Sequence, residues 1–300
     1  MYPLAEVFPP LQRLGRLPLT RDQLMMLVVA VSLSLTGFDT YLVHSAGSAV
    51  VWREWIPVVF GPSAGALLLF AGLIAVRNHG AAAGIATLTL LASIAVGLLG
   101  TWYHLEFGLQ PDALPGYRVS LHLLAFAPPI LGPMMFAIIG VLGMSAAWSE
   151  DPPGSGVLRI TQRFRLRLPY SKTRAYFFIV AMASLATVVS NALDHSHLSF
   201  PRASLLAPVA VGIFATTVAA TLGALERPGL ADYRTYVVAM LLLILIGPLG
   251  AALHIESNLV QGQVVVERLL RGAPLMAPLL FSNVGLLGLL VLLEPADATR

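Results

Sequence analysis

The sequence contains no cysteine, one lysine and few charged residues of any kind. The absence of cysteine excludes disulfides, thiolate metal sites and cysteine nucleophiles. Only 11% of the 300 residues are charged, whereas a soluble globular domain carries about 25%. With 57% hydrophobic residues and a mean hydropathy of +0.81, the chain has more apolar surface than a water-soluble fold of this length can bury. We therefore expect the lipid bilayer to be its main partner.

Signatures of soluble enzymes are also missing. The sequence has no glycine-rich phosphate loop, no serine elbow and no segment long enough for a domain outside the membrane. The net charge of +3 comes from arginines, with Lys172 the single lysine. In a membrane protein an excess of basic residues usually indicates which loops lie on the cytoplasmic side. We therefore do not expect nucleic acid as a partner.

Long apolar runs are the main feature that is present. A helix needs about 20 apolar residues to cross a bilayer, and the first run, 24–43, is longer than the apolar region of a signal peptide, so we expect it to be retained. The sequence predicts an all-α integral membrane protein with eight transmembrane helices arranged as four helical hairpins. The predicted spans are 24–43, 57–76, 81–103, 121–147, 175–193, 204–225, 235–253 and 273–293.

Basic residues distinguish the two sides of the membrane. Thirteen of the 18 lysines and arginines fall on the side that carries both termini, which predicts that both termini lie in the cytoplasm, at the inner membrane of a bacterium. The basic segment 149–174 is expected to lie on anionic headgroups, and a partner subunit could also bind to it. The predicted organisation is an N-terminal cytoplasmic or interfacial segment (1–23), a first four-helix repeat (24–148), a basic cytoplasmic linker (149–174), a second repeat (175–293) and a cytoplasmic tail (294–300).

The two predicted repeats resemble each other in sequence. Tyr-His-Leu-Glu at 103–106 and Leu-His-Ile-Glu at 253–256 are 150 residues apart, each at the end of the third helix of its half. Each half contains an even number of spans, so both should have the same orientation, related by a pseudo-two-fold axis normal to the membrane. Similar offsets relate His44 to His195, Pro57 to Pro208, and the proline-rich segments 127–133 and 273–278.

Histidines and carboxylates gather at the predicted outer ends of the helices. Imidazoles and carboxylates are the side chains that bind iron, copper, zinc or manganese without thiolates. Residues two apart do not share a face of a regular helix, so His-x-Glu pairs could both bind only where a helix ends. The predicted metal ligands are His44, His104, Glu106, His195, His197, His254 and Glu256.

Further polar residues are predicted to support this site. Metal-bound histidines normally donate their other N–H to a carboxylate or carbonyl. Asp39 lies about 7.5 Å deeper than His44 at the rise of a helix, which makes it an intramembrane carboxylate. The second-shell or proton-relay candidates are Asp39, His122, Asp194 and Glu267.

Three functions are compatible with these residues. The first is binding of a transition metal, mononuclear or dinuclear, or of a metallocofactor, in a membrane oxidoreductase that works with an extracytoplasmic redox partner. Haem is less favoured than a bare ion, because neighbouring carboxylates add negative charge that an iron porphyrin does not need. The second is transport of an ion or small solute. The third is a non-catalytic role beside other membrane subunits of a respiratory or photosynthetic complex, since few loops could bind anything soluble.

Overall fold

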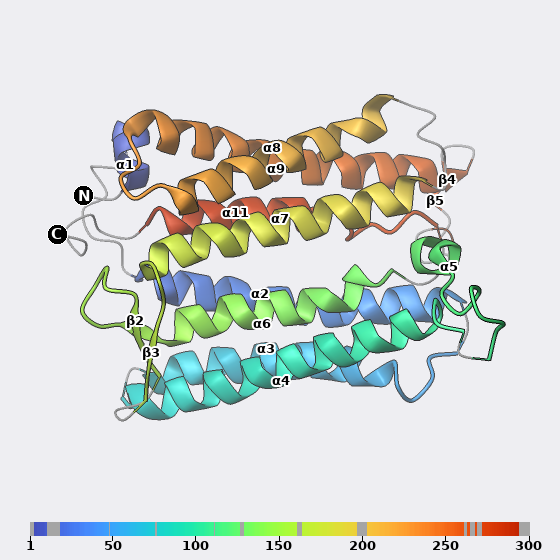
Figure 1. Ribbon diagram of the computed structural model, residues 1–300, viewed down its shortest axis with the longest axis horizontal. Coiled ribbons are helices and arrows are strands. Elements are labelled where there is room, and N and C mark those ends of the chain that lie inside the picture. Colours follow the sequence, from blue (N-terminus) through green and yellow to red (C-terminus); the bar gives the residue numbers. More distant parts are fainter. Residues whose placement is uncertain are drawn as a thin grey trace.

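A computed structural model gives the fold of the chain. It describes residues 3–10, 19–47, 49–75, 77–110, 112–126, 129–160, 164–196, 203–260, 263–264, 268 and 272–293. The described chain is mostly helical, with two small antiparallel sheets that the sequence did not predict. Both termini lie at one end of the molecule, called here the terminal end (Figure 1).

Six described helices are long and apolar enough to cross a membrane, which indicates a multi-pass membrane protein. They extend beyond the predicted spans by a few residues at most ends, because polar first and last turns are helical too. These six are α2 (Arg21–Gly47), α3 (Trp55–Ala75), α4 (His79–Glu106), α7 (Lys172–Ser196), α8 (Ala207–Ala224) and α9 (Leu230–Asn258).

The fourth and eighth predicted spans are shorter than expected. The fourth is divided between α5 (Leu121–Phe126) and α6 (Leu131–Ala147), and the eighth begins only at α11 (Leu279–Val291). Proline lacks the N–H that continues a helix, and prolines lie before or near the start of both helices. The remaining elements are α1 (Pro3–Val7), η2 (Ala203–Leu206), β1 (Ser149–Glu150), β2 (Val157–Arg159), β3 (Arg165–Arg167), β4 (Leu259–Val260) and β5 (Gln263–Val264).

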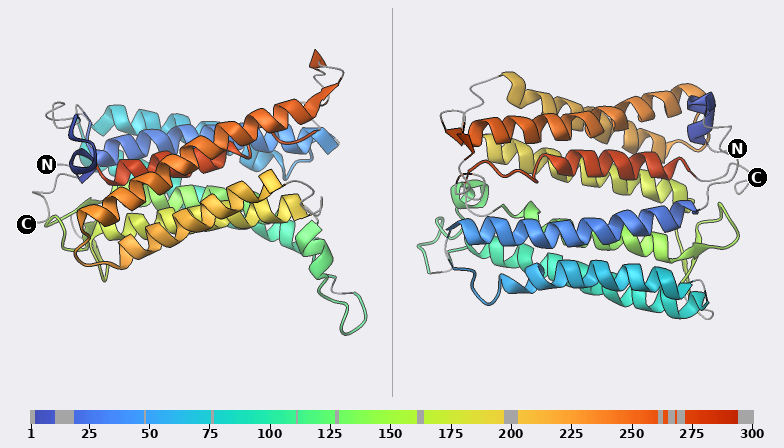
Figure 2. Two further views of the ribbon diagram at one scale, coloured as in Figure 1. Left: turned by 90° about the horizontal axis from the view of Figure 1, so that it is seen from above. Right: turned by 180° about the vertical axis from the view of Figure 1, so that it is seen from behind.

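The eight apolar helices pack as two four-helix bundles. In the first bundle α2 and α4 each pack against both α3 and α6, so α2 and α4 lie diagonally opposite. In the second bundle α7 and α9 each pack against α8 and α11 in the same way. The bundles meet through α6 on α7 and α11 on α2, and the right-hand view of Figure 2 shows one bundle beside the other.

Two glycines allow the helices that position the site to approach closely. A Cβ atom on Gly100 of α4 would lie 2.7 Å from Cβ of Pro133 in α6. A Cβ atom on Gly250 of α9 would lie 2.8 Å from Cβ of Pro278, the residue that precedes α11. Real Cβ atoms do not approach so closely, so both contacts require glycine. The same packing therefore occurs at corresponding positions of both bundles.

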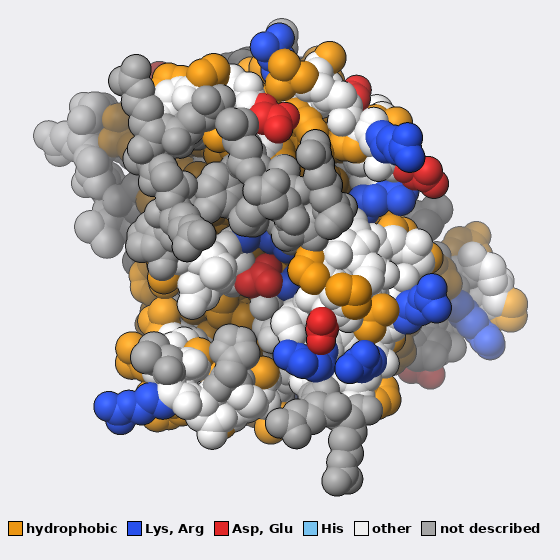
Figure 3. All heavy atoms as spheres, turned by 90° about the vertical axis from the view of Figure 1, so that its left-hand side faces the viewer, with side chains coloured by type: hydrophobic (Ala, Val, Ile, Leu, Met, Phe, Trp, Pro, Cys, Tyr) orange, Lys and Arg blue, Asp and Glu red, His pale blue; other side chains and the backbone are white. Residues whose placement is uncertain are grey.

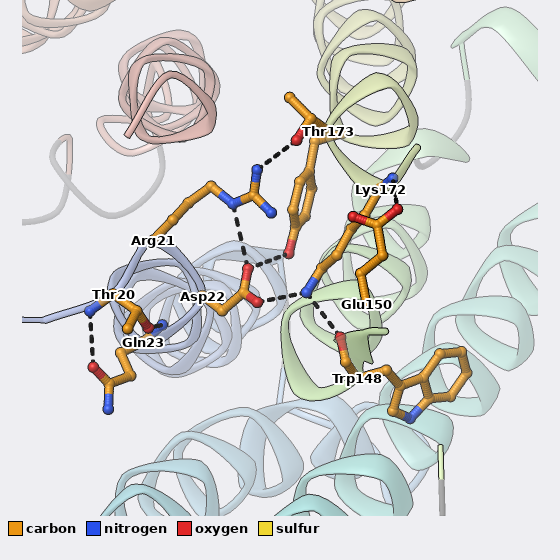
Figure 4. Close-up of polar contacts among 9 residues, drawn as sticks. Thr20, Arg21, Asp22, Gln23, Trp148, Glu150, Lys172 and Thr173 are labelled. Atoms are coloured by element: carbon orange, nitrogen blue, oxygen red, sulfur yellow. Dashed lines mark hydrogen bonds and ion pairs between the residues drawn. The ribbon is translucent and has the colours of Figure 1, made fainter. Parts of the chain in front are cut away.

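A charged network joins the first turns of α2 and α7 at the terminal end (Figure 4). Lys172 is buried and donates from Nζ to Asp22 Oδ2 and to the carbonyl of Trp148. Arg21 is also buried. Its Nε atom lies 3.4 Å from Asp22 Oδ1, and its Nη1 atom donates to Thr173 Oγ1 at 2.8 Å. The first turns of the two bundles are thus linked by hydrogen-bonded charges, which a low-dielectric surrounding makes strong.

Candidate functional site

Each bundle carries a pair of histidines at the end opposite the termini, called here the histidine end. In the first bundle the ring centres of His44 on α2 and His104 on α4 are 6.1 Å apart. In the second bundle those of His195 on α7 and His254 on α9 are also 6.1 Å apart. The members of each pair come from diagonally opposite helices, so they meet across the interior of their own bundle. All four side chains are half-buried.

The Nδ1 atom of every paired histidine faces a backbone carbonyl. On α2 and α7 this carbonyl belongs to the residue one turn earlier, Thr40 at 2.8 Å from His44 and Asn191 at 2.9 Å from His195. A carbonyl oxygen can only accept, so Nδ1 carries the proton. In a neutral imidazole the Nε2 lone pair is then left for another partner, which is the arrangement of metal-binding histidines.

The other two histidines reach across to the segments that precede α6 and α11. His104 donates to the carbonyl of Pro129 at 2.8 Å, and His254 donates to that of Pro274 at 2.7 Å. In each segment the residue four positions later is again a proline, Pro133 or Pro278. Proline has no N–H, so the usual helical partner of these carbonyls is missing. The Pro-x-x-x-Pro spacing therefore removes the usual donor from each carbonyl. The carbonyl of Pro129 also accepts the N–H of Gly132 at 3.3 Å, and its second lone pair serves the histidine of the neighbouring helix.

Local contacts hold the second of these carbonyls in place. Buried Asn258, the last residue of α9, donates from Nδ2 to the carbonyl of Ala273 and accepts the N–H of the same residue, both at 2.9 Å. These two hydrogen bonds fix the chain directly before Pro274. In the first half, the carbonyl of Gly108 accepts the N–H of Ser120 at 2.9 Å and ties the corresponding loop to the end of α4.

The spacing of each pair suits one shared metal ion. An ion midway between two Nε2 atoms, with bonds of about 2.0–2.1 Å, places the ring centres roughly 6 Å apart. Within the described ranges, however, no group of three or more histidines and carboxylates is close enough to hold an ion. Each pair thus offers two imidazole ligands, and four of the described histidines form two pairs rather than one cluster. Whether either pair binds a metal stays a prediction.

The other predicted site residues lie around these pairs or outside the described residues. Glu106 and Glu256 are exposed, two residues beyond His104 and His254, and the side chains of His122 and Asp194 are exposed as well. Asp39 is half-buried on α2. His197 and Glu267 lie outside the described residues, so the structure neither supports nor contradicts their roles.

Two residues near the pairs were missed by the sequence analysis. The carboxylate of Glu54, directly before α3, interacts electrostatically with His104. In the described part of the chain, the buried Oδ1 atom of Asn191 accepts no hydrogen bond. Asn191 lies one helical turn before His195, on the same face of α7. The sequence signal for Asn191 was its spacing of four residues from a histidine, and for Glu54 there was none.

Comparisons with protein-family models, with curated proteins and with solved structures find no match to this chain. Function is therefore inferred from the side chains themselves. Each histidine pair presents two imidazole nitrogen donors, oriented by carbonyls, at a half-buried position near the end of a helical bundle. Such a pair can bind one transition metal and leave its remaining positions to ligands that are not part of the protein.

Proposed function

We propose that the chain crosses the membrane eight times as two parallel four-helix repeats. The six long helices are supplemented by α6 and α11, which are apolar but have only 17 and 13 residues. The segments that precede them supply the missing length, with irregular backbone whose carbonyls are used by His104 and His254. Irregular backbone at membrane depth is tolerated where it is buried in protein.

Reciprocal contacts at the terminal end support the duplication. The offset of 151 residues relates Arg21 to Lys172, the first residues of α2 and α7, and Asp22 to Thr173. Arg21 donates to Thr173, and Lys172 donates to Asp22. The first residue of each half therefore contacts the second residue of the other half, as in an interface with two-fold symmetry.

Orientation follows from the distribution of basic residues. We place the terminal end in the cytoplasm of a bacterial inner membrane and the histidine end outside. Reporter tags after Ser155 and after Arg300 should then report the cytoplasm, and a tag in the loop 107–117 should report the outside. A cytoplasmic signal from the loop 107–117 would reverse the side on which both histidine pairs act.

We propose that each histidine pair binds one transition-metal centre, and that the protein has a redox role at the outer face of the membrane. The observation that carries this proposal is the repeated Nδ1 to carbonyl bond, which is present at all four histidines and leaves all four Nε2 atoms available. Histidines that only mark the membrane boundary would be expected to face lipid or water, not to pair across the interior of each bundle.

Both a bare ion and a haem are compatible with this donor set. A bare ion would complete its coordination with water, and iron, copper, zinc and manganese all accept imidazole. A haem would take the two imidazoles of one pair as its protein ligands and would supply electron transfer. The carboxylates that favoured a bare ion, Glu106 and Glu256, are exposed rather than grouped with the rings. An optical spectrum of the purified protein distinguishes the two.

Metal content of single variants tests the proposal. Two separate centres predict that His104→Ala and His254→Ala each remove about half of the bound metal, and that the double variant removes nearly all of it. His79→Ala, at the opposite end of α4, should leave the metal content unchanged. If either single variant abolishes all binding, one shared cluster replaces the two centres.

A purified wild-type protein that holds no metal and takes none up would end the proposal of a metal site. Transport, or a supporting role in a larger membrane complex, would then remain. Flux measurements in vesicles and the mass of the native complex would separate these two.

A further inference from the structure

The linker between the bundles folds as a small antiparallel sheet across the terminal end. Strand β1 pairs with β2, and β2 pairs with β3, with Arg159 directly opposite Arg165 and Leu158 directly opposite Leu166. Directly opposite residues lie on the same face of a sheet, and neighbours along a strand alternate between faces. Figure 1 shows the β2–β3 hairpin running from the start of α7 across the end of the first bundle.

The sheet is firmly attached to the helices. Glu150 Oε1 accepts the backbone N–H of Gly156 at 2.7 Å and that of Lys172, the first residue of α7, at 3.0 Å. The N–H of Leu168 donates to the carbonyl of Gly156 at 2.8 Å. Leu158 is only 2% exposed, so its face of the sheet is turned toward the bundle. The position of the opposite face is therefore fixed relative to the bundle.

The opposite face carries three arginines. Arg159, Arg165 and Arg167 alternate with leucines and fall together on this face, called here the arginine face. All three are exposed, and Arg159 lies 3.4 Å from Asp151 in an ion pair that is about half exposed. Like charges directly opposite destabilise a sheet. Figure 3 views the terminal end and shows several basic side chains exposed there, with acidic side chains among them.

The apolar face continues beyond the part that the bundle covers. Leu166 is 39% exposed, and Phe164, directly before β3, is 61% exposed. Alternation places Phe164 and Leu166 on the same face as buried Leu158. The hairpin thus has one apolar face, exposed toward its tip, and one arginine face. This two-faced pattern is the one that amphipathic segments use to lie in the plane of a membrane surface.

We propose that the β2–β3 hairpin lies at headgroup depth next to the first bundle, with Phe164 directed toward the acyl chains and the arginine face in contact with the surrounding anionic headgroups. Phosphate groups match guanidinium in charge and geometry, and the cytoplasmic leaflet is the negatively charged one. The proposal rests on the cytoplasmic orientation of the terminal end. It does not depend on metal binding at the histidine end.

The absence of cysteine makes a direct test possible. Phe164→Cys provides a single site for an environment-sensitive fluorophore on the full-length protein. In nanodiscs of phosphatidylcholine with phosphatidylglycerol, emission should shift to shorter wavelength and quenching by aqueous iodide should fall, relative to phosphatidylcholine alone. Both effects should diminish at high salt, because exposed charges are screened. Ser155→Cys, in the turn between β1 and β2, is the matched control and should respond little to lipid charge.

The role of the arginines is tested in the same background. Replacing all three residues of the arginine face by glutamine should abolish the dependence on phosphatidylglycerol while the bound metal and the helical content stay unchanged. Identical emission and quenching of the Phe164→Cys label in both lipids would overturn the proposal. The arginine face would then be a binding surface for an acidic protein instead. Labelling of the same cysteine in cells by a membrane-impermeant thiol reagent would show separately that the orientation is wrong.

Discussion

Replacing Asp22 by alanine removes the carboxylate that links the first turns of α2 and α7. Its Oδ2 atom accepts from Lys172, and its Oδ1 atom accepts from the hydroxyl of Tyr176 at 3.3 Å and from Arg21 Nε at 3.4 Å. Lys172 retains the carbonyl of Trp148 and the ring of Tyr176, whose centre lies 5.7 Å from Nζ. Neither of these neutralises an ammonium group that is 1% exposed.

The magnitude follows from this difference in burial. Removing one partner of a buried ion pair costs roughly 3–5 kcal/mol, because the remaining charge is left unpaired. Asp22 is 33% exposed, so water can reach the site and we expect the lower end, about 3 kcal/mol. The ion pair of Asp151 with Arg159 is 47% and 49% exposed. Asp151→Ala should therefore cost no more than about 1 kcal/mol.

The free energy of unfolding, measured by titration with SDS in mixed micelles, compares the two variants. Lys172→Met in the Asp22→Ala background removes the ammonium group that has lost this carboxylate, so it should recover part of the lost stability, while Arg21 still lacks its contact with Asp22. Equal losses for Asp22→Ala and Asp151→Ala would refute the reasoning. So would a double variant that is no more stable than Asp22→Ala alone.

Two further substitutions, each with a control, test the packing of the helices and the unsatisfied amide oxygen of Asn191. Gly100→Leu should destabilise the first bundle by about 1–3 kcal/mol through its clash with Pro133, whereas Gly72→Ala, with open space around its Cβ position, should be neutral by the same SDS titration. Asn191→Leu should stabilise the metal-free protein, because an unsatisfied buried acceptor costs about 1–3 kcal/mol. Thr40→Val in the first bundle should not stabilise it. The two variants are compared by heat denaturation. If Thr40→Val is the more stable and Asn191→Leu the less stable, Asn191 Oδ1 is already satisfied by water.

The sequence predicted the six long helices because the length of an apolar run is a direct physical constraint. Its errors fall where proline interrupts the pattern. The predicted span 121–147 reads as one apolar run, yet its prolines divide it into α5 and α6. Hydropathy cannot detect this break, since proline and leucine are both compatible with an apolar stretch. The strands of the linker were missed because each has only two or three residues.

The sequence analysis named the four paired histidines but not how they pair. Matched histidines at the ends of the first, third, fifth and seventh spans were visible in the sequence. Which of them meet depends on which helices lie diagonally within a bundle, and residue spacing does not contain that information. His104 and His254 correspond to each other in the repeat, yet each faces the histidine of its own half. The Pro-x-x-x-Pro segments were also visible, and their open carbonyls could have been paired with these two histidines.

The surroundings of the two pairs differ although their hydrogen bonds correspond. The offset of 151 residues places Thr40 where the second half has Asn191, and Glu54 where it has Leu205. The hydroxyl of Thr40 donates to the carbonyl of Thr36 at 2.8 Å, so the first pair has no open acceptor at this position, but it has a carboxylate nearby. The second pair has the open amide oxygen, and among the described residues Leu205 stands at the position that corresponds to Glu54. Hydrogen bonding and charge around metal-binding histidines tune the metal they hold. Two centres with the same imidazole ligands would therefore differ in affinity and reduction potential, with the first favouring the more positively charged state.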